Sequence, residues 1–305
     1  MAVISTGSHP KALWPGIKAW WGRNYNQFPQ EWKEIFDLET SNKAYEEDVE
    51  ITGFGLAPIK SEGAAVEYDQ ENQGLVSRYV HIAYSLGYIV TKEELDDNQY
   101  EVVSKRRTEA LAFSVRQTLE NVGANILNRA FNTSYAPTGE TGVSLCSTSH
   151  VTGGGLTQSN RLATDADLSE ASLEDMIVQI MTAQNARGLR ISLTPRKMIV
   201  PPQLVFTAQR ILKSDQRVNT ANNDVNAVKS MGLLPGGAVV NHYLTDTDAW
   251  FIKTDAPRGL IAYERQKADF NQDNDFDTSN AKAKSYVRMA FGATDFRGIY
   301  GTPGA

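Results

Sequence analysis

The sequence predicts an α+β fold with two domains and with parts that extend beyond a single compact core. Residues 48–92 are rich in valine, isoleucine and tyrosine, which favour β-strands. Residues 93–131 place apolar side chains at steps of mostly three or four, as an amphipathic helix does. The chain of 305 residues is long enough for about two domains.

The composition excludes several classes of protein. With 41% hydrophobic and 22% charged residues, the chain has an ordinary folding composition. No apolar run approaches the roughly 20 residues needed to cross a bilayer, and the N-terminus does not read as a secretory signal, so we expect no membrane partner. The single cysteine, Cys146, excludes an internal disulfide and fits a reducing cytosol. A net charge of −6 argues against a protein that mainly neutralises phosphates.

The N-terminal segment, residues 1–45, holds four of the five tryptophans. Prolines and glycines are mixed with them, and little regular periodicity is visible. We expect these indoles to be buried either against the chain's own core or against a neighbouring subunit. A membrane-surface role is disfavoured because no sustained basic amphipathic helix accompanies the rings. All four are candidate subunit-contact residues: Trp14, Trp20, Trp21 and Trp32.

Residues 48–92 predict a long β-hairpin. The segments "VEITGFG" and "RYVHIAYSLGYIV" form its arms, and the polar "KSEGAAVEYDQENQG" lies between them. This tip has few large apolar residues, so it is unsuited to a compact core and is expected to reach outward. Tyr68 and Arg78 are candidate subunit-contact residues here.

A single long helix is expected over residues 93–131. Only Gly123 interrupts the good helix formers, and the predicted length is roughly 50 Å at 1.5 Å per residue. Such a helix is longer than the core of one small domain can cover.

The middle of the chain alternates loops with short elements. Residues 132–160 form a Gly/Ser/Thr loop, and a helix follows for which Ser172 and Asp175 are a plausible capping box and Gly188 an end. A short buried strand is expected at "KMIV", and Pro202 starts another helix.

A polar loop from Ser214 to about Lys229 is too long for a simple connection. We interpret it as a contact element, with Asp215 and Arg217 as candidate subunit-contact residues. Strands resume at "AVVNHYL", "AWFIKT" and "GLIAYER", and the chain ends in "AKSYVRMAFGATDFRGIYG", whose alternation is typical of a half-buried strand.

The stretch "FNQDNDFDT", residues 270–278, resembles the start of a calcium loop because Asp273, Asp275 and Asp277 alternate. Such a loop needs glycine at its sixth position and glutamate at its twelfth, where this chain has Thr278 and Lys284. We therefore prefer a strand with the three acids on one face. That face is solvated, matched by Lys or Arg of another subunit, or occupied by an adventitious ion at a symmetry axis. The second alternative makes all three candidate subunit-contact residues.

No catalytic constellation is recognisable. Cys146 and His150 are four residues apart in a flexible loop, without a rigid base geometry or an orienting third group. The histidines offer no zinc spacing, and "GGGLTQS" lacks the lysine of a phosphate loop. The basic "SKRR", residues 104–107, is better explained as a solvated helix face than as a nucleic-acid site. We predict no catalytic residue, no metal site and no cofactor.

Four separated segments together resemble the major head proteins of Mu-like tailed bacteriophages. They are "YVHIAYSLGYIVTKEELDDNQYEVVSKRRTEALAFSVRQTLENVGANILNRAFN", "RILKSDQRVNTANNDVNAVKSMGLLP", "VVNHYLTDTDAWFIKTD" and "FDTSNAKAKSYVRMAFGATDFRGIYG". The resemblance covers nearly the whole chain and is weakest before Lys11. It implies the Hong Kong 97-like capsid fold, with an N-terminal arm, an extended loop, a long spine helix and two domains.

The resemblance also implies a division of the chain. The N-terminal arm would be residues 1–45 and the extended loop residues 46–92. The peripheral domain would comprise residues 93–169 and 263–291, and the axial domain residues 170–262 and 292–305. The Ser214–Lys229 loop would then point to the centre of a ring of subunits, and the acid stretch would lie where adjacent rings meet.

The function implied is that of a major capsid protein, not an enzyme, which self-assembles into the icosahedral head enclosing double-stranded DNA. The expected partners are copies of the chain in pentamers and hexamers, a scaffolding protein, a maturation protease, a portal and possible decoration proteins, with non-specific DNA contacts. The place would be the virion, assembled in the host bacterial cytoplasm. The alternative is a soluble two-domain α+β enzyme or ligand-binding protein.

Overall fold

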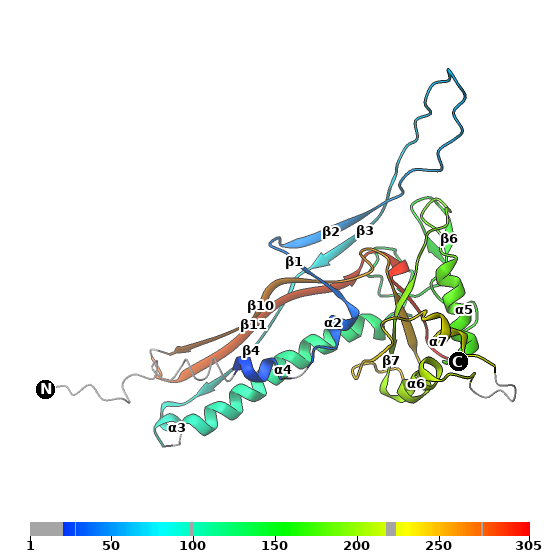
Figure 1. Ribbon diagram of the computed structural model, residues 1–305. Coiled ribbons are helices and arrows are strands. Elements are labelled where there is room, and N and C mark those ends of the chain that lie inside the picture. Colours follow the sequence, from blue (N-terminus) through cyan, green and yellow to red (C-terminus); the bar gives the residue numbers. More distant parts are fainter. Residues whose placement is uncertain (1–20, 28, 98–99, 218–223, 276) are drawn as a thin grey trace.

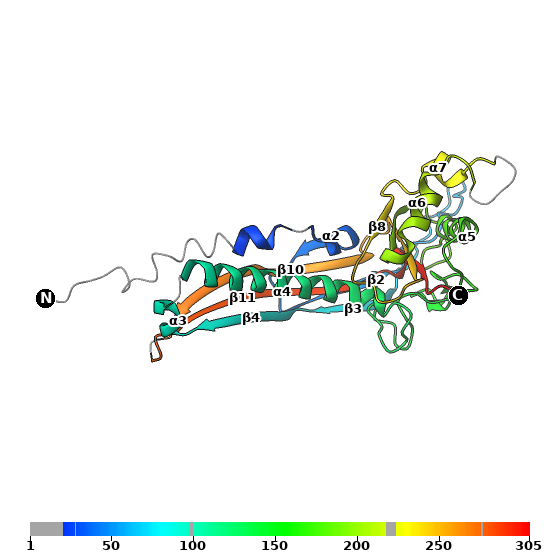
Figure 2. The same ribbon diagram turned by 90° about the horizontal axis from the view of Figure 1, so that it is seen from below.

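A computed structural model describes residues 21–305, except residues 28, 98–99, 218–223 and 276. The molecule is elongated (Figure 1). A long helix lies along one sheet, a second sheet with three helices forms the other end, and a two-stranded hairpin projects from the body. Figure 2 shows the long helix against the face of the first sheet.

The first sheet has the strand order β1-β10-β11-β4. β10 and β11 are a long antiparallel pair, β4 adds antiparallel to β11, and β1 adds parallel to β10. Buried and more exposed residues alternate along much of β11, as predicted for a half-buried strand. The bounds are β1 Asp37–Thr40, β4 Ile82–Val90, β10 Leu260–Asn274 and β11 Ala281–Ala293.

A long helix is present as α4, Tyr100–Asn128, but it is shorter than the single helix predicted over residues 93–131, and the short α3, Lys92–Asp97, precedes it. At 29 residues it is about 43 Å long. Its apolar stripe is buried against β11 and forms the first core with it. The principal contributors are Leu111, Val115, Leu119, Leu127, Val287 and Met289.

Two of the N-terminal tryptophans complete this core. Trp21, in a helical segment at residues 21–25, stacks on Tyr25 and on Phe270, with ring centroids 4.7 and 5.8 Å apart. Trp32 begins α2, Trp32–Ile35, and is only 2% exposed. Since both indoles are buried by their own chain, they have little surface left for a neighbour, which corrects the subunit-contact assignment for these two. Trp14 and Trp20 lie outside the described residues.

The second sheet has the order β12-β9-β7-β8. Its core is formed with α5, α6 and α7 around the fully buried Trp250. The strand expected at "KMIV" and the helix expected after Pro202 are both present. The bounds are α5 Glu170–Met181, β7 Pro195–Val200, η3 Pro202–Leu204, α6 Val205–Lys213, α7 Ala227–Met231, β8 Ala238–Val240, β9 Trp250–Thr254, η4 Phe296–Gly298 and β12 Ile299–Thr302.

The start and end of α5 differ from the prediction. Ser169 is the N-cap, and Ser172 at the third helical position completes a reciprocal capping box with it. The helix ends at Met181, well before Gly188. The helix begins at this serine pair because the Ser172 hydroxyl accepts from the Ser169 N–H and the Ser169 hydroxyl accepts from the Ser172 N–H. These bonds cap the helix about one turn earlier than Ser172 and Asp175 would.

The hairpin is present but its return arm differs. β2, Tyr45–Ile51, pairs antiparallel with β3, Gln73–Val80, and residues 52–72 between them contain no strand. The predicted arm continued to residue 90, but from Ile82 the chain enters the first sheet as β4. It does so because Tyr84 and Tyr88 pack against the core under α4. The projecting part is therefore shorter than predicted. A further small hairpin, β5 His150–Val151 with β6 Thr157–Gln158, lies near its root.

The acid stretch is not one strand. β10 ends at Asn274, so only Asp273 belongs to it, and Asp275 and Asp277 lie in the connection to β11. Lys282 pairs with Asp275 at 2.7 Å, and this hydrogen-bonded ion pair holds the pKa of Asp275 below its usual range. The prediction of three acids on one strand face was wrong because the β10–β11 hairpin must turn here.

Leu119→Ala should lower the free energy of unfolding of the isolated subunit by about 3 kcal/mol, because it opens a cavity between α4 and the first sheet. Chemical denaturation measures this. Asn121→Ala, on the exposed side of the same helix, should cost less than about 0.5 kcal/mol. Equal effects of the two changes would contradict the packing described.

Candidate assembly interface

The projecting loop, residues 52–72, exposes large apolar side chains that its own chain does not cover. Ile59 is 99% exposed and Tyr68 is 94% exposed. A soluble monomer seldom presents such a group on a protruding segment. The others are Phe54, Leu56 and Val66. We call residues 52–72 the hairpin tip.

The root of the hairpin is fixed to the first sheet by the buried Asp48 of β2. Its carboxylate accepts hydrogen bonds from Thr294 Oγ1 at 2.8 Å and from the Tyr263 hydroxyl at 3.3 Å, and it pairs with the Arg258 guanidinium. Tyr79 of β3 donates to Thr294 at 2.5 Å, so both hairpin strands join one network. A buried carboxylate is stable only with such partners.

Two glycines let the neighbouring loop come close to this root. A Cβ on Gly153 would lie 2.7 Å from the Gly74 Cα in β3, and one on Gly154 would lie 2.0 Å from the Ala186 carbonyl oxygen. Neither contact is sterically possible for another residue without a backbone shift. The "GGG" of the sequence is therefore a close-packing element, a role that its composition alone did not reveal.

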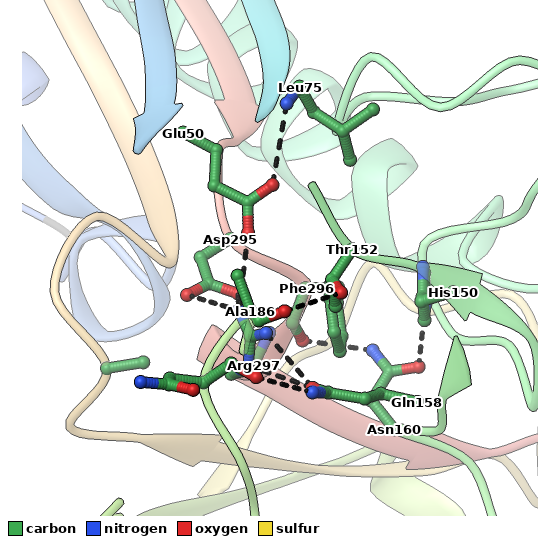
Figure 3. A network of polar contacts seen from close by, with 12 residues as sticks. Glu50, Leu75, His150, Thr152, Gln158, Asn160, Ala186, Asp295, Phe296 and Arg297 are labelled. Carbon is green, nitrogen blue, oxygen red and sulfur yellow. Dashed lines mark hydrogen bonds and ion pairs between the residues drawn. The ribbon is translucent and has the colours of Figure 1, made fainter. Parts of the chain in front are cut away.

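A buried network around Arg297 connects the hairpin root with the second sheet (Figure 3). The guanidinium donates to the Gln184 carbonyl at 2.8 Å and to Gln158 Oε1 at 3.0 Å. It also pairs with Asp295 at 3.1 Å and lies 3.9 Å from Glu50 of β2. Because Arg297 is only 5% exposed, these bonds form away from solvent and orient the hairpin relative to both sheets.

His150 belongs to the same region and is fully buried. Asn160 Nδ2 donates to three backbone carbonyls, which leaves its Oδ1 to accept from His150 Nε2 at 3.0 Å. His150 Nδ1 contacts the Glu140 carboxylate. Burial raises the pKa of the Cys146 thiol, which therefore remains protonated. Both ring nitrogens of His150 are engaged by Glu140 and Asn160, so His150 has a structural role in this buried network and does not contact Cys146 as a base.

The base of the hairpin tip also contacts the loop between α5 and β7. Arg187 pairs with Asp69 at 2.6 Å and donates to the Gln70 carbonyl, and Gly55 N–H donates to Asp69 at 2.7 Å. These contacts support the tip only at its base.

The remaining predicted residues are dispersed. Arg78 lies over the Tyr45 ring at 4.1 Å within the hairpin itself. Asp215, 90% exposed at its side chain, pairs with Lys229, and Arg217 lies 3.5 Å from Glu170. The structure thus brings Tyr68 and Arg78 onto one projecting element and leaves Asp215, Arg217 and the acids of the β10–β11 turn at other places on the surface.

The N-terminal segment is held on α4 by Glu120, which the sequence did not single out. Its carboxylate accepts from the Glu31 and Trp32 N–H groups at 3.1 and 3.0 Å. Arg116 donates to the Tyr25 carbonyl, and Glu31 pairs with His242 at 2.6 Å. Burial, and less strongly the Glu31 carboxylate, raises the pKa of Glu120 to about 7.

Within the described residues, no group of three or more His, Cys, Asp or Glu side chains is placed to hold a metal ion. None of the helices in the part of the chain that the structure describes is long and apolar enough to cross a membrane.

Residues 76–302 match the sequence profile of the phage capsid protein family. The chain belongs to this family. The matched range contains β4, α4 and both sheets apart from β1, so it includes most of the architecture described above. A search of curated proteins found no match for this capsid protein.

Solved structures give the fold. The virus-like particle from Pyrococcus furiosus matches with a TM-score of 0.54 at 13% identity, covering 94% of this chain and 98% of that chain. The capsid of the native GTA particle matches with a TM-score of 0.56 at 11% identity, covering 90% of each chain. The capsid of Myoviridae phage XM1 matches with a TM-score of 0.53 at 10% identity, covering 89% of each chain.

The predicted Hong Kong 97-like capsid fold is confirmed by these matches. Membership of the family establishes the predicted function as well: the chain is a phage major capsid protein, which forms the icosahedral head. This membership implies a structural role and a place in the virion.

Asp48→Asn should loosen the hairpin root, because an amide cannot accept all the bonds that the carboxylate accepts. We expect a loss of about 2 kcal/mol in unfolding free energy, and faster hydrogen exchange in β2 and β3. Glu47→Gln, which alters an exposed ion pair on the same strand, should cost under about 1 kcal/mol. Unchanged exchange in Asp48→Asn would refute the anchoring role.

Glu120 should make the stability depend on pH. Its pKa of about 7 lies above the usual 4.5, so the folded chain keeps a proton that the unfolded chain has released. Stability should therefore fall as the pH rises from 4.5 to 7. In denaturant titrations over this pH range, the free energy of unfolding should fall less for Glu120→Gln than for the wild type. For Glu67→Gln, at the exposed tip, it should fall as much as for the wild type. Equal slopes in wild type and Glu120→Gln would contradict this.

Proposed function

We propose that this capsid protein is the repeating subunit of the head of a Mu-like tailed phage, arranged in pentamers and hexamers around packaged double-stranded DNA. The observation that carries the proposal is the hairpin tip, whose apolar side chains are exposed although its root is rigidly anchored. In the assembled head each tip lies over an adjacent subunit, and the exposed apolar area is covered there.

The domain division follows the two cores. The first sheet with α4 forms the peripheral domain, and the second sheet with α5, α6 and α7 forms the axial domain. Residues 1–45 are the N-terminal arm, which adds its strand β1 to the edge of the first sheet. The extended loop ends near Val80 in this proposal, because β4 is part of the first sheet.

Two polar surfaces provide further subunit contacts in this arrangement. The loop with Asp215 and Arg217 points to the centre of each ring. The exposed Asp273 and Asp277 at the β10–β11 turn face basic side chains where rings meet. The alternative, that these two acids are only solvated, predicts assembly that does not respond to their removal.

The role is structural and not catalytic. A net charge of −6 suits a wall that contacts DNA without binding it tightly. The partners are copies of the chain, with a scaffolding protein, a maturation protease, a portal and possibly decoration proteins, during assembly in the host bacterial cytoplasm.

Expression of the chain followed by size-exclusion chromatography and electron microscopy tests the proposal. Shells, tubes or rings of five or six subunits support it. A monodisperse monomer or small dimer would instead contradict the proposed arrangement in pentamers and hexamers.

Replacing Ile59 and Tyr68 together by Ser should reduce assembly strongly, because the two most exposed apolar side chains of the tip are removed. The unfolding free energy of the subunit should change by less than about 0.5 kcal/mol, since neither side chain packs in its own chain. Particle yield and chemical denaturation measure the two effects. Lys60→Ser is the matched polar control and should assemble normally. Full assembly of the Ile59/Tyr68 variant would remove the tip from the interface.

A further inference from the structure

The two edges of the first sheet differ in a way that indicates where the hairpin tip binds. β1, one edge, has only four residues and carries Asp37 and Glu39. β4, the other edge, has nine residues, "IAYSLGYIV", with neither a charge nor a proline. Short, charged edges prevent strand addition, whereas long, uncharged edges permit it. Only β4 is therefore suited to accept another strand.

The outer edge of β4 is also left unpaired by the part of the chain that the structure describes. All residues of β4 except Tyr84, Tyr88 and Val90 are exposed, and its register with β11 is continuous, without a bulge. No other strand of the described residues pairs with its outer edge. Figure 2 shows β4 along the margin of the body. Its exposed apolar side chains, Ile82, Leu86 and Ile89, are between 49% and 58% exposed.

The chain contains a segment that fits this edge. Residues 64–68 of the hairpin tip, "AAVEY", have no strand partner in their own chain and are all exposed. Valine and tyrosine favour strands, and in an extended chain Val66 and Tyr68 share one face while Glu67 lies on the other.

The faces of β4 match this pattern. Leu86 is opposite the buried Ser285, so it lies on the α4 side, where Val66 and Tyr68 find apolar contact. Gly87 is opposite Lys284, on the outer face. Because Gly87 has no side chain, the exposed Lys284 is free to reach across β4 toward Glu67 of an added strand. The residue directly opposite it on β10, Asn271, is not acidic, whereas Asp269 and Asp273 lie diagonally from it on the same strand.

We propose that residues 64–68 of a second copy of this chain add to the outer edge of β4 as a fifth strand of the first sheet, with Glu67 of that copy paired to Lys284. The inference rests on the proposed function, since it names the surface that receives the tip. The added strand gives each contact backbone hydrogen bonds as well as apolar burial.

A charge exchange tests the pair. Glu67→Lys and Lys284→Glu should each raise the subunit concentration needed for assembly about two- to fivefold, as expected for an exposed ion pair. The double variant should restore the wild-type value. Both side chains are exposed, so folding is unaffected. Glu39→Lys, on the opposite edge, is the matched control and should not rescue Lys284→Glu. A double variant no better than the single ones would overturn the pairing.

Hydrogen exchange of the wild type distinguishes a failure of strand addition at β4 from a failure of capsid assembly. If particles form and the β4 amides become protected relative to the free subunit, the strand addition is supported. If particles form and these amides exchange equally fast in both states, strand addition is refuted while the capsid assembly stands. If no assembly occurs at all, the proposed function itself fails.

Discussion

The buried carboxylate of Asp48 joins the projecting hairpin to the first sheet, and the direction of the hairpin depends on it. An isolated two-stranded sheet is at best marginally stable in water. β2 and β3 therefore need contacts beyond each other, which they obtain from Thr294, Tyr263 and Arg258 through this one side chain. The Arg297 network holds the other side of the same root. A fixed root lets an otherwise unsupported loop present its side chains at a reproducible position.

Rigid and exposed parts are thus separated along the chain. The long α4 buries one stripe against β11, so the first sheet keeps its shape without a partner. The hairpin tip has no comparable burial within its own chain. In the proposed assembly its exposed apolar side chains are covered by an adjacent subunit, and the same contact recurs in every subunit. Distributed burial of this kind gives a large total interface without a single strong site.

Local patterns made much of this fold predictable, and tertiary contacts decided the rest. The steps between Leu111 and Ala130 predicted α4, and alternation predicted β11, because both depend on short-range periodicity. The partner strand of residues 82–90 was not predictable in the same way, since the sequence pattern of a strand is the same in a projecting hairpin and in a sheet. Asp48 is one of several acids in "YEEDVE", and nothing local marks it as the buried one.

Trp21 and Trp32 are buried in their own chain, so these two tryptophans offer little apolar surface for a neighbour, whereas the hairpin tip exposes much. Tryptophans already packed in their own core gain nothing from a neighbour. The tip differs, because burying one side chain of the size of Val, Leu, Ile or Phe contributes about 1.5–3 kcal/mol. In the proposed contact the five exposed groups of the tip would together contribute on the order of 10 kcal/mol, before the cost of ordering the loop is subtracted. The anchored root reduces that cost, so in the proposed assembly the same Asp48 network that orients the hairpin would also strengthen its binding to a neighbour.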